Sequence, residues 1–82
     1  MSADVAKSVC EYVVKQIVDQ PDAVSVAQSE TDTGIRLDVT VGDGDMGRVI
    51  GKRGRVASAI RTVVRSAGID DELAAIEVEF VD

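Results

Sequence analysis

The run from Val49 to Arg55 constrains the fold of this chain more than any other stretch. It places two cationic side chains, Lys52 and Arg53, between Gly51 and Gly54. The apolar pair Val49-Ile50 precedes the first of these glycines, and a helix-patterned segment follows the second. Glycines let backbone pass close to backbone and leave no side chain in the way of a ligand. The run therefore predicts a tight connection between two helices that presents positive charge to a polyanion.

Charge is segregated along the chain. Residues 46–69 contain six basic residues and no acidic one, although the whole chain has a net charge of −6. The rest of the chain holds the other three basic residues and all 15 acidic ones. Net charge alone would argue against a nucleic-acid partner, but this segregation argues for one. The six basic residues are Arg48, Lys52, Arg53, Arg55, Arg61 and Arg65.

The composition narrows the function classes. The chain has no histidine, which removes the usual general base and the commonest metal ligand. The single cysteine, Cys10, has no histidine to activate it, so we expect a small core residue and not a nucleophile. The sequence predicts no catalytic residue, no cofactor and no metal site. Tyr12 and Phe80 are the only aromatic residues, too few for a base-stacking platform.

Length and hydropathy predict a single domain over residues 1–82, located in the cytoplasm. At 82 residues the chain is the size of one small domain. No charge-free apolar run approaches the roughly 18 residues that span a membrane. The first residues also lack the basic segment that begins a secretory signal.

Hydrophobic periodicity predicts the element order α-β-β-α-α-β. Pro21 should end the first helix, because the residue before a proline disfavours helical backbone. Asp45 is expected to cap the short second helix, and Gly68 to stop the third. The expected elements are a first helix before Pro21, strands at 23–29 and 35–41, helices at 46–50 and 55–67, and a last strand at 76–80.

The segment Ile50-Gly51-Lys52-Arg53-Gly54 between two helices resembles the signature of a KH domain. The element order resembles the type II, bacterial arrangement of that domain, over nearly the whole chain. The longer run from Met46 to Val64, with the boundary at Gln20-Pro21-Asp22, is similar to the KhpA family of small bacterial single-KH RNA-binding proteins. The resemblance implies an α+β type II KH domain. Its three-stranded mixed sheet, with the second and third strands parallel and the first antiparallel to the second, is covered on one face by three helices.

The resemblance also implies a function, that of an RNA chaperone without enzymatic activity. In a KH domain the glycine loop clamps the backbone of about four single-stranded nucleotides. Val49, Ile50 and Val56 would give the bases an apolar floor. The implied partners are single-stranded RNA and a larger KH protein of the KhpB type, with roles in post-transcriptional regulation, cell-wall and cell-shape control. The expected RNA-binding residues are Arg48, Val49, Ile50, Gly51, Lys52, Arg53, Gly54, Arg55 and Val56.

The helix at 55–67 has a wider apolar arc than a core-facing helix needs, which favours a homodimer or a heterodimer with a related KH protein. Ala59 and Val63, at one edge of the arc, are the expected contact. The alternative is that this edge packs on the first helix of the same chain. Two other functions stay open. One is a protein-interaction module whose KH fold serves dimerisation, with weak RNA binding, and the other is a small nucleotide-dependent catalyst using residues 42–54.

Overall fold

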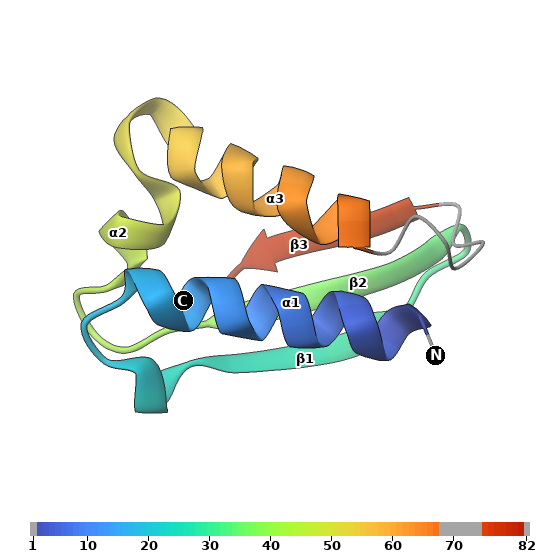
Figure 1. Ribbon diagram of the computed structural model, residues 1–82, viewed down its shortest axis with the longest axis horizontal. Helices are drawn as coiled ribbons and strands as arrows, with labels where there is room; N and C mark the ends of the chain where they lie inside the picture. Colours follow the sequence, from blue (N-terminus) through green and yellow to red (C-terminus); the bar gives the residue numbers. More distant parts are fainter. Residues whose placement is uncertain (1, 68–74, 82) are drawn as a thin grey trace.

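The computed structural model describes residues 2–67 and 75–81, and these form the predicted order of helices and strands (Figure 1). Two short 3-10 turns, η1 and η2, stand beside the regular elements. The elements are α1 (Ser2–Ile17), η1 (Pro21–Ala23), β1 (Ser25–Glu30), β2 (Gly34–Thr40), α2 (Met46–Ile50), η2 (Lys52–Gly54), α3 (Arg55–Ala67) and β3 (Ala75–Phe80).

The boundaries differ from the prediction where a local turn intervenes. The first strand begins at Ser25 and not at residue 23, because Pro21 starts the turn η1. Val24, expected on the strand, therefore precedes it and is half-buried. α1 ends at Ile17, before the proline that was expected to stop it. The predicted stop at Gly68 lies outside the described residues.

The sheet has the order β1-β2-β3, with β1 antiparallel to β2 and β2 parallel to β3. Leu37 in the central strand pairs with Gln28 on one side and with Val78 on the other. The predicted strand directions are thus confirmed. The alternation of β2 is also confirmed, because Ile35, Leu37 and Val39 are buried while Arg36 and Thr40 are exposed.

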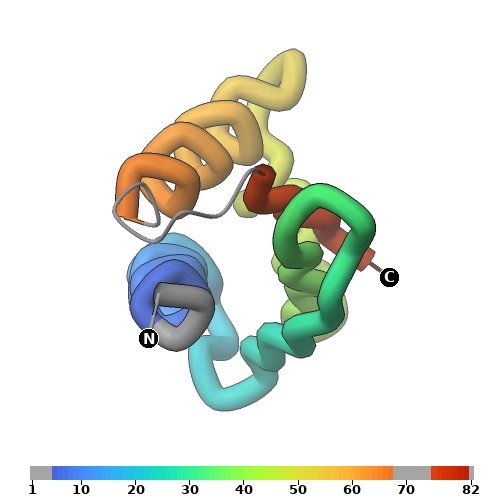
Figure 2. The backbone as a smooth tube through the Cα atoms, turned by 90° about the vertical axis from the view of Figure 1, so that its right-hand side faces the viewer, coloured from blue at the N-terminus to red at the C-terminus, as the bar shows by residue number. Residues whose placement is uncertain are grey.

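The helices lie on one face of the sheet. Figure 2, turned by 90° from Figure 1, shows α1 and α3 on one side and the strands on the other. Val49 of α2 is fully buried in the same core. The type II KH arrangement expected from the sequence is therefore the observed one. The opposite face of the sheet points away from the helices and carries Arg36, Asp38, Glu77 and Glu79.

The core is aliphatic and lies between the sheet and the helices. Its largest fully buried side chains are Leu37, Ile60 and a set of valines. Each element adds its own apolar positions: every second residue of a strand, and one stripe of a helix. The buried hydrophobic residues are Ala6, Cys10, Val14, Val18, Val26, Ile35, Leu37, Val39, Val49, Ala57, Ile60, Val64, Ile76 and Val78.

Among the residues that the structure describes, none of the helices combines the length and the apolar character that a membrane crossing requires.

Cys10 is a core residue, as predicted. Burial, and to a smaller extent the charge of Glu11, raises the pKa of its thiol from the ordinary value of 9.0 to about 11. The folded protein therefore keeps this proton at pH values where the unfolded chain has lost it. Below pH 9 the two states bind the same proton, and above it the unfolded state binds fewer, so stability falls as pH rises.

We predict that Cys10→Ala abolishes this part of the pH dependence. Wild type should lose stability between about pH 9 and pH 11 more steeply than the variant, because only wild type carries the titrating thiol. Chemical denaturation of both proteins across that window measures the difference. A constant difference in free energy of unfolding at every pH would contradict the prediction.

Candidate nucleic-acid interface

The glycine loop, residues Gly51–Gly54, reverses the chain between α2 and α3 with left-handed backbone. Gly51 has φ 74° and ψ 179°, and Gly54 has φ 73°. Arg53 between them has φ 56° and ψ 26°, a region that non-glycine residues rarely occupy. The amide of Gly51 bonds to the carbonyl of Gly47 at 2.9 Å, which closes α2 before the turn. Such backbone outliers often mark functional loops.

Gly51 is required for space as well as for conformation. A Cβ atom built at Gly51 would lie 2.4 Å from Cγ2 of Val56 and 2.8 Å from its Cβ. The branched side chain of Val56 stands at the start of α3, so the helix is packed directly on the loop backbone. At Gly54 and Gly47 an added Cβ would meet nothing within 4 Å, and Gly47 lacks a positive φ. The spatial constraint is therefore at Gly51.

Three cations project from this loop and the residue after it. Lys52, Arg53 and Arg55 are exposed and line one shallow hollow of the surface. Within residues 5–67 and 75–81 they make no ion pair and no side-chain hydrogen bond. Their positive charges are thus turned to solvent at one place, next to the first turn of α3.

The other three members of the basic block are engaged within the protein, which the sequence did not reveal. Arg48 Nη2 donates to Asp19 Oδ2 at 2.9 Å, and its Nε lies 3.6 Å from Asp45 Oδ1. Arg61 and Arg65 follow the flank of α3 that faces β3. The predicted continuous block of six basic residues is therefore divided into two sets. Three cations have no ion-pair partner among the described residues, and three arginines bond within the protein.

Arg61 and Arg65 cover the free edge of the sheet. Arg61 Nε donates to the carbonyl of Val78 at 3.0 Å, and Arg65 Nε to that of Ile76 at 3.1 Å. The guanidinium carbon of Arg61 also lies 5.5 Å from the ring centroid of Phe80, within range of a cation–π contact. Edge strands need such cover against pairing with other chains. In the sequence, the four-residue spacing of Arg61 and Arg65 beside the buried stripe of α3 could have indicated that both side chains lie on one flank of the helix.

The expected apolar floor needs one correction. Val49 has 0% exposed surface and belongs to the hydrophobic core, so it cannot offer a surface to a base. The helical phase of α2 turns Val49 inward, toward the sheet. Ile50 and Val56 are half-buried, pack against the core and keep part of their surface beside the loop. Of the three predicted residues, these two are placed where a ligand at the loop could reach them.

Asp45 stands at the N-cap position of α2, as predicted, but the structure contradicts the capping role of its side chain. Its side chain makes no capping hydrogen bond to the helix. Instead the carboxylate is 2% exposed and accepts the backbone N–H groups of Asp19 and Gln20 at 3.2 and 3.0 Å. These partners lie 25 and 26 residues away in sequence, just after α1. No local pattern could have indicated this contact.

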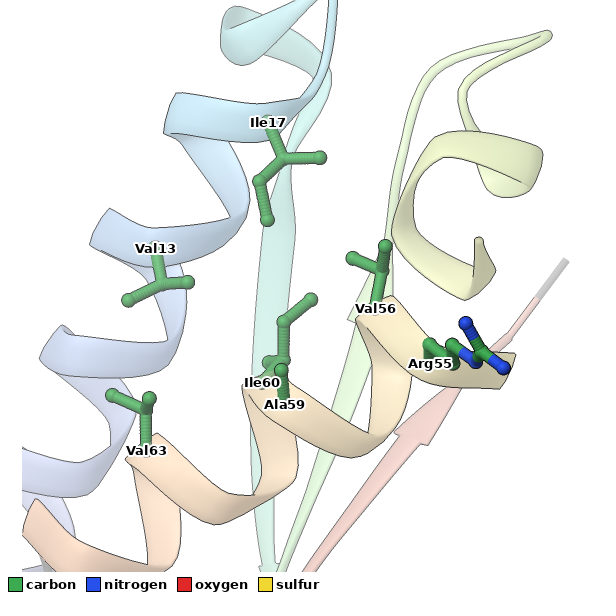
Figure 3. Close-up of a pocket in the computed structure, with 7 residues that line it drawn as sticks. All are labelled: Val13, Ile17, Arg55, Val56, Ala59, Ile60 and Val63. Atoms are coloured by element: carbon green, nitrogen blue, oxygen red, sulfur yellow. The ribbon is translucent and has the colours of Figure 1, made fainter. Parts of the chain in front are cut away.

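An apolar groove of about 280 Å³ is lined by residues of α1 and α3 (Figure 3). Val13 and Ile17 come from α1, and Val56, Ala59 and Val63 from α3. Figure 3 shows Val63 opposite Val13, while Arg55 lines the end of the groove at the start of α3. Val63 is 46% exposed, so it faces the first helix without being buried by it. The expected packing of this edge within the chain is therefore incomplete.

Comparison with known proteins agrees with this architecture. The family described as "KhpA/KhpB, KH domain" matches residues 7–79. A relative from Clostridium acetobutylicum, named RNA-binding protein KhpA, is 43% identical over 65 residues, which cover 79% of this chain and 87% of the relative. Proteins of the same name from Listeria monocytogenes and Streptomyces coelicolor are each 50% identical, over 56 and 58 residues. Those alignments cover 68% and 71% of this chain, and 74% and 73% of the relatives.

The geometry predicts different outcomes for alanine at three glycines. Gly51→Ala should destabilise the fold by about 1–3 kcal/mol, because the methyl group collides with Val56 in an already left-handed backbone. Gly54→Ala should cost about 1–2 kcal/mol through its positive φ alone. Gly47→Ala, in the open on α2, should be neutral or stabilise by up to about 1 kcal/mol. Thermal and chemical denaturation give this ranking, and equal effects at Gly51 and Gly47 would contradict it.

Proposed function

This chain belongs to the KhpA/KhpB family of KH domains, and from that premise we propose that it binds single-stranded RNA through the glycine loop. One observation carries the proposal. Lys52, Arg53 and Arg55 stand free of protein acids, within the described residues, on a left-handed loop that opens a 13-residue helix. The names of the three relatives, RNA-binding protein KhpA, support the same reading.

The loop can hold a phosphate by two means that act together. Amides in the first turn of a helix lack intrahelical acceptors, and the helix dipole favours an anion at that end. The start of α3 follows the loop directly. Lys52 adds a compact charge, while Arg53 and Arg55 add planar donors that suit phosphate oxygens. Gly51 and Gly54 keep side chains out of the approach.

Single strands are favoured over duplexes because the contact involves unstacked bases as well as phosphates. KH loops hold the backbone of about four nucleotides, so the bases of that stretch are free to face the protein. Ile50 and Val56 offer them aliphatic surface beside the loop. With two aromatic residues in the chain, stacking on protein rings plays a small part.

The acidic sheet face supports the choice of the loop. Asp38, Glu77 and Glu79 lie on adjoining strands on the side away from the helices. Hydrogen bonding to Asp38, and then its charge, raises the pKa of the Arg36 guanidinium on the same face. Arg36 is thus paired with Asp38 at 2.7 Å and adds little attraction for a polyanion. RNA is repelled from this face and drawn to the loop.

The proposal extends to the setting of this binding. We place the protein in the cytoplasm as an RNA chaperone in post-transcriptional regulation, acting with a larger KH protein of the KhpB type. The family description covers both KhpA and KhpB, and their pairing rests on the resemblance to KhpA. Roles in cell-wall and cell-shape control rest on the resemblance to KhpA alone.

The double substitution Lys52→Asp with Arg53→Asp tests the loop. Both side chains are exposed, so the fold should lose no more than about 0.5 kcal/mol per change. Two negative charges at the phosphate position should abolish measurable binding to a short unstructured RNA. Fluorescence anisotropy measures the affinity, and circular dichroism checks the fold.

The matched control is Lys7→Asp with Lys15→Asp. It changes the net charge by the same amount on α1, away from the loop. The control should keep most of the wild-type affinity. Equal losses in both double variants would show that binding follows net charge and not the loop, and full affinity in the loop variant would remove the proposal.

A second function, self-association, is favoured by the half-exposed Val63. Ala59 and Val63 border the α1–α3 groove, and the outer residues next to them, Ser58, Thr62 and Ser66, are uncharged. A helix face without charge suits the close approach of a second helix. We propose that α3 contributes to a homodimer, or to a heterodimer with a related KH protein, with Ala59 and Val63 at the contact.

Val63→Arg separates the assembled state from the free chain. The side chain is already 46% exposed, so the variant should remain folded. A buried arginine at the interface should instead convert the dimer to a monomer. Light scattering gives the mass, with Val5→Arg on the outside of α1 as a control of similar exposure, 48%. A folded variant with the wild-type mass would show that Val63 is not at the contact.

A further inference from the structure

Asp45 is the one charged or polar residue among the buried side chains of the described chain. Its Oδ1 accepts the N–H of Asp19 at 3.2 Å, and its Oδ2 accepts the N–H of Gln20 at 3.0 Å. Both donors follow the end of α1, where backbone N–H groups turn away from the helix. A buried carboxylate is tolerated when such donors satisfy it. Asp45 thus supplies the acceptors for the two backbone N–H groups that follow α1.

The same residue also begins α2. Its backbone carbonyl accepts the N–H groups of Arg48 and Val49 at 3.0 and 3.3 Å. Two exposed contacts run in parallel with the buried one. Gln20 Nε2 donates to the carbonyl of Asp43 at 2.7 Å, and Arg48 Nη2 donates to Asp19 Oδ2 at 2.9 Å. One carboxylate therefore joins the end of the long helix α1 to the start of the short helix α2.

This junction matters because α2 has five residues and cannot hold its own shape or position. The glycine loop starts at Gly51, directly after it. Val49, buried in the core, fixes the middle of α2. Asp45 fixes its first turn. Two such contacts define the orientation of α2, whereas a single contact would let the helix rotate about it. The angle at which the loop leaves the body of the protein thus depends on Asp45.

We propose that Asp45 is a positioning residue for RNA binding: by tying α2 to α1 it holds the glycine loop in its binding geometry, without touching the RNA itself. The inference rests on the proposed function of the loop. It predicts a change in RNA affinity opposite in sign to the change that simple electrostatics predicts. Replacing Asp45 by a neutral residue removes a negative charge and the 3.6 Å contact of that charge with Arg48 Nε, so charge alone would strengthen RNA binding. Loss of positioning would weaken it.

Asp45→Ala tests the inference in the full-length protein, with a short unstructured RNA as the probe. We expect the affinity to fall about fivefold or more, in the range usual for coupling between separate sites. Without RNA, amide hydrogen exchange should become faster at Gly51 and Gly54 while the amides of β2 remain protected. Asp45→Asn keeps one acceptor oxygen and should recover part of both properties.

The control is Val26→Ala, a buried change in β1 that lowers stability away from the loop. It should keep wild-type affinity and loop exchange, so a loss seen in both variants would mean that stability alone is responsible and would overturn the inference. Unchanged or tighter binding by folded Asp45→Ala would overturn it as well. If Asp45→Ala does not fold, Asp45→Asn carries the test, because it removes the charge and one of the two acceptor oxygens: weaker binding and faster loop exchange than in wild type support the inference, and wild-type or tighter binding with wild-type exchange contradicts it.

The double loop substitution keeps the two hypotheses apart. If Lys52→Asp with Arg53→Asp leaves RNA affinity intact, the proposed function fails whatever Asp45 does. If that variant loses binding while Asp45→Ala keeps it, the loop is the site and only the positioning role is wrong.

Discussion

The position of the glycine loop depends on how the five-residue helix α2 is held. A helix of this length has too few hydrogen bonds to persist in water, so its place comes from its tertiary contacts. Val49 inserts into the core from its middle, and Asp45 joins its start to the residues after α1. At its other end Gly51 packs on Val56, with no room for a side chain. The short helix and the loop that follows it are thereby held in place at both ends.

The distribution of charge over the protein leaves exposed positive charge beside this loop. The chain is acidic overall. Arg36 and Arg48 form ion pairs with acidic side chains, so they offer little charge to an anionic ligand. Arg61 and Arg65 donate hydrogen bonds to the carbonyls of β3. What remains beside the loop is a cluster of three cations, Lys52, Arg53 and Arg55, that pair with no acidic side chain of the described residues. A cluster of cations on an otherwise acidic protein attracts a polyanion to that cluster. A uniformly basic surface would bind it less selectively.

Elements with a strong local signal could be predicted from the sequence. The alternation of Ile35, Leu37 and Val39 fixed the central strand and its buried face, and the spacing of Ala57, Ile60 and Val64 fixed the buried stripe of α3. The glycine loop was evident because its residue types are tied to backbone conformation. Strand directions followed from the KH resemblance, since periodicity alone does not give them.

Features that depend on long-range geometry could not be predicted. Aspartate is a usual residue at a helix N-cap, but the carboxylate of Asp45 accepts hydrogen bonds from residues 25 and 26 positions away in sequence. The sequence predicts Val49 at the surface because it adjoins the glycine loop, whereas the direction of its side chain is set by how α2 docks on the sheet. The sequence predicts Arg61 and Arg65 as part of one basic surface, whereas both donate hydrogen bonds to carbonyls of β3.

An NMR titration of the ¹⁵N-labelled protein with a short single-stranded RNA tests the central claim most directly. The amide of every residue reports on its own surroundings, so the site is located without any substitution. The largest shifts should appear at residues 51–56, with small changes at Asp38, Glu77 and Glu79 on the open face of the sheet. Largest shifts on that sheet face, or no shifts at the loop under saturating RNA, would contradict the account.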